Sequence, residues 1–159
     1  MFEILSKYNH NGRFDFRPND DLSQVCNAPI DKSGVYMVWD TKNPSNKELI
    51  YIGRSGIKKG GIIHHRKDGI FGRIVKGYQF GRTPRRKSWP KKMKDIEIFV
   101  ITVSWYNTEQ DNPEEIEDKL LSEHIYYFNG KKPKWNKRNP RRLYTIEEIY
   151  LDYINIHTC

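Results

Sequence analysis

Two features of this sequence could do chemistry: long runs of cationic residues, and a carboxylate on the apolar side of a helix. Residues 54–94 contain fourteen Lys and Arg residues and a single acid, Asp68. Residues 130–142 add seven cations and no acid, although the whole chain of 159 residues carries only +8. Because each phosphate contact releases condensed counterions, such segregated charge favours binding of a polyanion. Trp89 and Trp135 lie within these blocks and could stack on bases or belong to the core.

The carboxylate is that of Glu117. Residues 113–128 are predicted to form a helix, since Asn112 is an N-cap candidate, Pro113 suits the first helical position and Asn129-Gly130 ends the pattern. Apolar residues at helical spacing gather on one side of this helix, and Glu117 lies near the middle of that side. A buried carboxylate is costly unless it is paired, protonated or bound to a cation. Glu117 is therefore a candidate functional residue.

The elements that must position these residues are short strands and helices. Residues 34–40 and 48–53 are rich in β-branched and aromatic residues and flank a run of turn residues, which predicts a hairpin. Residues 95–106 give the clearest strand pattern, and we expect this strand to lie centrally in the sheet. The pattern of residues 70–76 predicts a short helix that ends near a glycine. Residues 145–156 begin with a Thr-x-x-Glu capping box, which predicts a terminal helix.

The remaining segments are predicted to be irregular. Residues 54–69 contain four glycines and many charges, which favours a loop. After the short helix, a second, basic loop is expected to extend to Pro90. Residues 1–33 are mixed, with a short extended piece and a turn, and we assign this N-terminal arm no role. The expected fold is therefore α/β (α+β), with a small antiparallel sheet of about three strands flanked by helices in one domain spanning residues 1–159.

Several classes of protein are excluded by composition. Apolar residues make up 36% of the chain, enough for one core, so wholesale disorder is not expected. The longest apolar-rich stretch, residues 96–106, is far shorter than the ~20 residues of a membrane span. The N-terminus lacks the order of a secretory signal, and Cys26 and Cys159 are too few for a disulfide framework. We expect a reduced, soluble protein of the cytoplasm with no membrane partner.

Five short patterns occur in an order that resembles the GIY-YIG nuclease family. Gly34-Val35-Tyr36 is followed, after fourteen residues, by Tyr51-Ile52-Gly53. Arg73 then stands in a short helical segment, and Glu117 begins a Glu-x-x-Leu-Leu pattern. Residues 133–136 close the series as Pro-x-x-Asn. The resemblance covers residues 34–136, which would form the nuclease core between the N-terminal arm and a C-terminal helical segment, residues 137–159.

The resemblance implies a divalent metal, Mg²⁺ or Mn²⁺, and cleavage of phosphodiester bonds. It implies catalytic roles for Tyr36, Tyr51, Arg73, Glu117 and Asn136. Glu117 would hold the metal, since Mg²⁺ keeps several waters and takes few protein ligands. Arg73 would donate its two-pronged guanidinium to the scissile phosphate. One of the two tyrosines would act as general base, with the choice between them open, and Asn136 would position the site.

Two of these assignments have rivals. Residues 54–69 lengthen the usual distance from the Tyr-Ile-Gly pattern to the arginine, which makes Arg66 an alternative to Arg73. We prefer Arg73 because its context is helical and apolar. Glu123 lies closer in sequence to Asn136 and is an alternative to Glu117 as the metal ligand. It falls at the edge of the apolar side of the helix, however, where a surface carboxylate is the ordinary interpretation.

The basic residues of the first block are candidates for nucleic-acid binding. The family often has a histidine shortly after its arginine, and Lys76-Gly77 stands there instead, which leaves His64 or His65 in that role, or no histidine. The candidates are Arg54, Lys58, Lys59, His64, His65, Arg66, Lys76, Arg82, Arg85, Arg86, Lys87, Lys91 and Lys92.

The resulting hypothesis is a metal-dependent DNA endonuclease, of the type II restriction kind because a standalone domain with basic insertions could supply its own DNA recognition. Double-stranded DNA is the expected partner, and a homodimer would suit cleavage of both strands. The alternative is a noncatalytic nucleic-acid-binding domain that keeps the fold and the basic surface. A protein-interaction module that uses its basic loops on acidic partners is a third interpretation.

Overall fold

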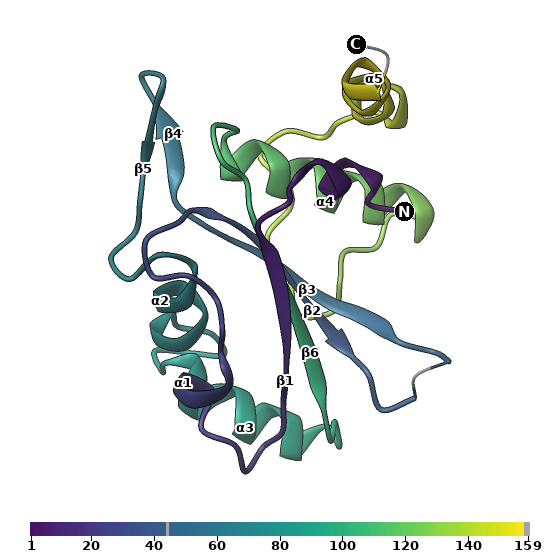
Figure 1. Ribbon diagram of the computed structural model, residues 1–159. Coiled ribbons are helices and arrows are strands. Elements are labelled where there is room, and N and C mark those ends of the chain that lie inside the picture. Colours follow the sequence, from purple (N-terminus) through teal and green to yellow (C-terminus); the bar gives the residue numbers. More distant parts are fainter. Residues whose placement is uncertain (44, 158–159) are drawn as a thin grey trace.

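The computed structural model describes residues 1–43 and 45–157 and has an antiparallel sheet with helices on both faces (Figure 1). The sheet strands are β1 (Asn11–Phe16), β2 (Gly34–Asp40), β3 (Glu48–Ser55) and β6 (Ile101–Asn107), in the order β1-β6-β2-β3. A separate ribbon pairs β4 (Ile57–Lys59) with β5 (Ile62–His64). The helices are η1 (Glu3–Lys7), α1 (Leu22–Val25), α2 (Gly69–Lys76), α3 (Arg85–Asp95), α4 (Pro113–Tyr127) and α5 (Ile146–His157). The expected mixed α+β fold class is confirmed.

Side chains from the two faces of the sheet enter different cores. Tyr36 and Val38 on β2 point into a core with α1, α2 and α3, whereas Val35 and Met37 point into a core with η1 and α4. This alternation follows from the two-residue repeat of a strand. The two layers of helices are visible on opposite sides of the sheet in Figure 1.

The predicted hairpin, short helix, long helix and terminal helix are all confirmed. Asn112 is the N-cap of α4, and its side chain accepts a hydrogen bond from the backbone N–H of Glu114 at 3.2 Å. The capping box before α5 is also present, since Thr145 N–H donates to Glu148 and Glu148 N–H donates to the Thr145 hydroxyl. These local signals were sufficient because the groups that they join are close in sequence.

The N-terminal arm is part of the sheet, so the expectation of about three strands was one short. β1 pairs along its whole length with β6, from Asn11 opposite Tyr106 to Phe16 opposite Ile101. Phe14 and Phe16 are buried in the core, as the alternating pattern of this strand requires. β6 thus lies between β1 and β2, which confirms its predicted central position in the sheet.

The basic segment before Pro90 was predicted to be a loop and is instead largely helical. α3 runs from Arg85 to Asp95 with Pro90 inside it. Arg85, Trp89 and Met93, spaced by four residues, are all buried on one side, and this burial outweighs the cost of an internal proline. The predicted strand over 95–106 accordingly shortens to β6, because Asp95 ends α3 and Glu97 adopts a left-handed φ of 58°.

The predicted loop over residues 54–69 contains the β4–β5 ribbon, which projects from one end of the sheet (Figure 1). Gly60 and Gly61 form its turn with φ values of 58° and 75°, a conformation that glycine adopts without strain. Within the described residues, no helix is long and apolar enough to cross a bilayer. Cys26 is a free, buried thiol, and Cys159 lies outside the described residues.

Candidate active site

The paired strands β2 and β3 bring the two tyrosines together. Tyr36 lies opposite Gly53, and Tyr51 lies two residues further along on the same face, so that their ring centroids are 6.0 Å apart. A Cβ atom on Gly53 would lie 2.5 Å from the Tyr36 hydroxyl, which explains why this position needs glycine. The Tyr36 side chain is 0% exposed and its hydroxyl has no partner among the described residues. Burial raises the pKa of Tyr36, whereas Tyr51 lines an open cleft.

This cleft has a volume of about 720 Å³ and contains most of the predicted site. Tyr51, Arg73, Glu117 and Asn136 all line it, although they come from four different segments of the chain. Tyr36 is the exception, since it lies beneath Tyr51 and does not line the cleft. Of the two predicted catalytic tyrosines, therefore, Tyr51 is the one that can contact a ligand in the cleft directly.

Arg73 reaches the cleft because α2 is fixed on its other side. Ile70 and Ile74 are fully buried against the sheet, and the half-buried Arg73 between them faces the cleft. Its rival Arg66 is exposed and lines the same cleft. Desolvation of its guanidinium by the surrounding protein, and then the nearby positive charge of Arg73, lower the pKa of Arg66. Two guanidinium groups thus face one cavity.

Glu117 enters the cleft from the first half of α4. Its carboxylate is 18% exposed and lies 3.5 Å from the Arg54 Nε atom. Burial raises the pKa of Glu117 to about 7, and Arg54 only partly opposes that shift. Arg54 itself is shared with Glu114, whose carboxylate lies 3.1 Å away. Glu117 is therefore a desolvated acid with incomplete charge compensation.

Glu123 is not a surface carboxylate, which corrects the ordinary interpretation of that residue. It is 0% exposed and accepts a hydrogen bond of 3.0 Å from the backbone N–H of Phe2. Burial raises the pKa of Glu123 as well. The N-terminal arm covers this turn of α4, a contact between residues 121 positions apart that helical spacing could not reveal. Glu123 does not line the cleft.

Asn136 attaches the closing segment of the predicted core to β3. Its side-chain oxygen accepts from the Ile52 N–H at 2.9 Å, and its side-chain amide donates to the Ile52 carbonyl at 2.9 Å. The Trp135 N–H also donates to the Ile50 carbonyl at 2.8 Å. These bonds pair backbone groups on the outer edge of β3 that would otherwise lack partners. Asn136 thereby holds this wall of the cleft in place.

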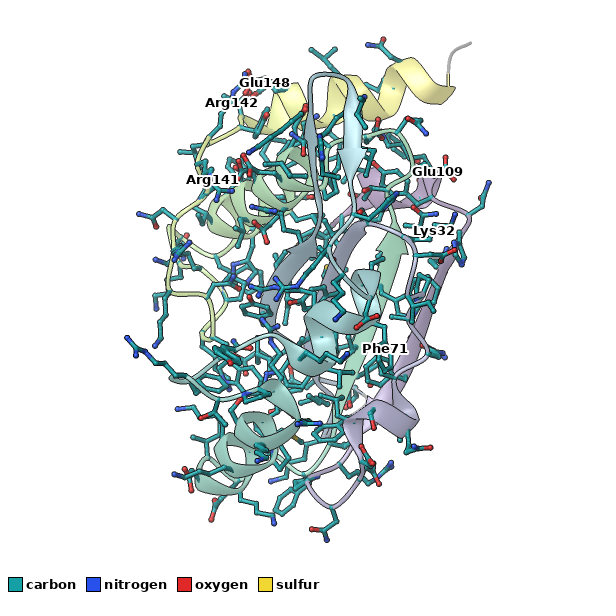
Figure 2. The ribbon with its side chains drawn as sticks, turned by 90° about the vertical axis from the view of Figure 1, so that its left-hand side faces the viewer. Lys32, Phe71, Glu109, Arg141, Arg142 and Glu148 are labelled. Atoms are coloured by element: carbon teal, nitrogen blue, oxygen red, sulfur yellow. The ribbon has the colours of Figure 1, made fainter. Side chains whose placement is uncertain are left out.

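The rim of the cleft is cationic. Six Lys and Arg side chains line it against two acids, Glu117 and Asp118. Asp118 accepts hydrogen bonds from the backbone N–H groups of Arg141 and Arg142 at 3.1 and 3.3 Å. It therefore fixes the end of the second basic block, where Figure 2 labels Arg141 and Arg142. The six cations are Arg54, Arg66, Arg73, Lys137, Arg138 and Arg141.

The candidate nucleic-acid-binding residues fall into three groups. Arg54, His64, His65 and Arg66 line the cleft, with Arg54 half-buried and the other three exposed, and His65 contacts the Ser33 hydroxyl at 2.7 Å. Most of the others lie outside the cleft and are exposed or half-buried: Lys58, Lys59, Lys76, Arg82, Arg86, Lys87, Lys91 and Lys92. Arg85 is 1% exposed, so its assignment as a surface contact for nucleic acid was wrong.

A second cleft, of about 760 Å³, lies against the other core and is lined by residues such as Met37, Trp39 and Leu49. It contains none of the predicted catalytic residues. Over residues 1–43 and 45–157, no cluster of three or more His, Cys, Asp or Glu side chains could hold a metal ion. Two acids line the first cleft; the oxygens of Asp118 accept backbone hydrogen bonds, which leaves Glu117 as the candidate to hold a divalent cation. Comparisons of the chain with protein-family models, curated proteins and solved structures found no match.

Proposed function

We propose that this protein is a metal-dependent endonuclease of the GIY-YIG type that hydrolyses phosphodiester bonds in double-stranded DNA, in the manner of a type II restriction enzyme. The observation that carries the proposal is the convergence of Tyr51, Arg73 and Glu117 on one cleft with a cationic rim. Phosphodiester hydrolysis needs an oriented water, charge neutralisation on the phosphoryl oxygens and stabilisation of the leaving oxygen. These three side chains supply groups suited to the task.

Each residue has a role that follows from its place. Arg73 binds the non-bridging oxygens of the scissile phosphate with its forked donors. Tyr51, as its phenolate, orients the attacking water and accepts its proton at Oη, a role that the buried Tyr36 cannot take because it does not reach the cleft. Tyr36 packs beneath Tyr51 and fixes its ring. Asn136 keeps β3 and the closing segment in register.

Glu117 fits a Mg²⁺ or Mn²⁺ ion. The Glu117 carboxylate is desolvated, its pKa is raised to about 7, and its ion pair with Arg54 Nε spans 3.5 Å, so a further cation would stabilise its charged form. Mg²⁺ commonly binds through one or two carboxylates together with waters and substrate phosphates. When bound, such an ion neutralises charge on the phosphate and the leaving oxygen.

The basic segments on the rim would hold the DNA backbone. Lys137 and Arg138 line one part of the cleft, and the β4–β5 ribbon carries Lys59 and His64 as exposed side chains near another. Contacts of this kind supply affinity and register, whereas base recognition would come from side chains that enter a groove. Cleavage of both strands would suit two copies of the protein on one duplex.

The test is cleavage of supercoiled plasmid and of a long genomic DNA with Mg²⁺ or Mn²⁺, with EDTA as the control. We expect nicked and linear products from the wild type, at discrete positions if recognition is of the restriction kind. Chelation and Glu117→Gln should each abolish cleavage. The matched control is Glu115→Gln, on the same helix but 47% exposed and outside the cleft, which should cut normally.

Two outcomes contradict the proposal. Normal cleavage by Glu117→Gln would remove Glu117 from the mechanism. Tight DNA binding by a folded wild-type protein with no cleavage in either metal would instead favour the noncatalytic binding domain. Salt dependence of binding would not separate these functions, because both make phosphate contacts.

A further inference from the structure

Beneath the cleft lies a buried cation that the proposed mechanism does not yet use. Arg85, at the start of α3, is 1% exposed, and all three of its nitrogen positions donate hydrogen bonds. Nε donates to Gln79 Oε1 at 2.9 Å, and Nη1 donates to the Arg73 carbonyl at 2.6 Å. Nη2 donates to the Tyr51 hydroxyl at 3.2 Å. Arg85 therefore contacts both the backbone of Arg73 and the functional atom of Tyr51.

The surroundings of Arg85 are aromatic and neutral. Its guanidinium carbon lies 5.5 Å from the ring centroid of Tyr51 and 5.7 Å from those of Tyr36 and Trp89. Its hydrogen bonds all go to uncharged acceptors, and it forms no ion pair with a carboxylate in the part of the chain that the structure describes. The resting protein therefore stabilises this buried charge with hydrogen bonds and aromatic rings, and leaves it without a carboxylate that would neutralise it.

The protein makes room for this guanidinium. A Cβ atom on Gly77 would lie 2.2 Å from Arg85 Nη1, so no larger residue fits there while Arg85 keeps its place. Gln79 fixes the orientation further, since its Oε1 atom also accepts from Trp89 Nε1 at 2.8 Å.

We propose that Arg85 is a positioning residue that holds Tyr51 Oη from the protein interior and stabilises the negative charge of the phenolate form that accepts a proton from the attacking water. This role rests on the proposed nuclease function. In the balance of that step, the water proton passes to the phenolate Oη of Tyr51, which becomes neutral, and the water oxygen bonds to phosphorus. The bond to the leaving oxygen breaks, and that oxygen takes up a proton from water. Arg85 contacts no substrate and acts only through Tyr51.

The test is a double-mutant cycle of Arg85→Lys and Tyr51→Phe, followed by single-turnover cleavage of a duplex oligonucleotide. Loss of one aimed donor typically lowers a rate by about 100-fold or more, so we expect at least a tenfold loss from Arg85→Lys in the wild-type background. In the Tyr51→Phe background, which lacks the acceptor, the same substitution should change the residual rate by less than about threefold. DNA affinity should stay within about threefold in all four proteins, because Arg85 is buried.

Lys94→Met is the matched control, since Lys94 is exposed on the same helix and lies outside the cleft. It should leave both the DNA affinity and the single-turnover rate unchanged. If Arg85→Lys does not fold, Arg85→Ala with millimolar guanidinium keeps the test decisive: the added cation should restore the rate by at least about tenfold, and no restoration in a folded variant would overturn the proposal.

The possible failures are distinguishable. Additive losses in the cycle, with an active wild type, would overturn the role of Arg85 and leave the nuclease function intact. A wild-type protein that cleaves no DNA would overturn both.

Discussion

The carboxyl of Glu117 should make the folded protein less stable as pH rises. Replacing it with an uncharged amide should remove this loss of stability. The pKa of Glu117 is raised to about 7 from an ordinary value of 4.5, because burial disfavours the charged form. The folded protein thus holds a proton between about pH 4.5 and 7 that the unfolded chain has released. The stabilisation that protonation gives is present below pH 4.5 and lost as pH rises through 7.

The size of the effect follows from the same values. A difference of about 2.5 pH units corresponds to roughly 3 kcal/mol at pH 8. Glu117→Gln keeps the shape of the protonated acid, and Arg54 retains Glu114 as its partner at 3.1 Å. We therefore expect the free energy of unfolding of this variant to exceed that of wild type by about 3 kcal/mol at pH 8 and by less than about 0.5 kcal/mol at pH 4.

Urea unfolding at the two pH values, in metal-free buffer, measures this difference directly. Glu115→Gln is the control: the Glu115 side chain is 47% exposed, so the effect of this substitution should differ by less than about 0.5 kcal/mol between the two pH values. An equal gain at both pH values, or a loss of stability at pH 8, would refute the assignment of Glu117 as a desolvated acid. A gain in stability that accompanies lost cleavage is the expected sign of a functional group retained at a cost to the fold.

Three further predictions concern the walls of the cleft. Gly53→Ala should destabilise the fold by about 1–3 kcal/mol in urea unfolding, because the added Cβ would lie 2.5 Å from the Tyr36 hydroxyl; an unchanged midpoint would mean that the ring moves freely. Asn136→Ala should cost about 2 kcal/mol through its two bonds to Ile52, and a wild-type midpoint would show that the edge of β3 is satisfied otherwise. Arg138→Gln should lower the slope of log affinity against log salt for duplex DNA by about 0.9, measured by fluorescence anisotropy, and an unchanged slope would place the DNA elsewhere.

Local signals in the sequence accounted for much of the fold. The β-branched runs of β2 and β3, the Asn112 cap and the capping box at Thr145 involve neighbouring groups, and each was confirmed. The helix α3 was missed because Pro90 and a high density of charge argue against a helix locally. The repeat of Arg85, Trp89 and Met93 every four residues was the signal that could have revealed it.

The sequence by itself determined the identity of the candidate groups: two strand tyrosines, an arginine on a short helix, a carboxylate on an apolar helix side and two cationic blocks. Tertiary structure decided which of them share a cleft. Tyr36 is buried, whereas Tyr51 lines the cleft. Glu123 is covered by the N-terminal arm, whereas Glu117 faces the cleft. The physical reason is that a side chain's solvation depends on segments far away along the chain, and these segments are fixed only when the two cores form.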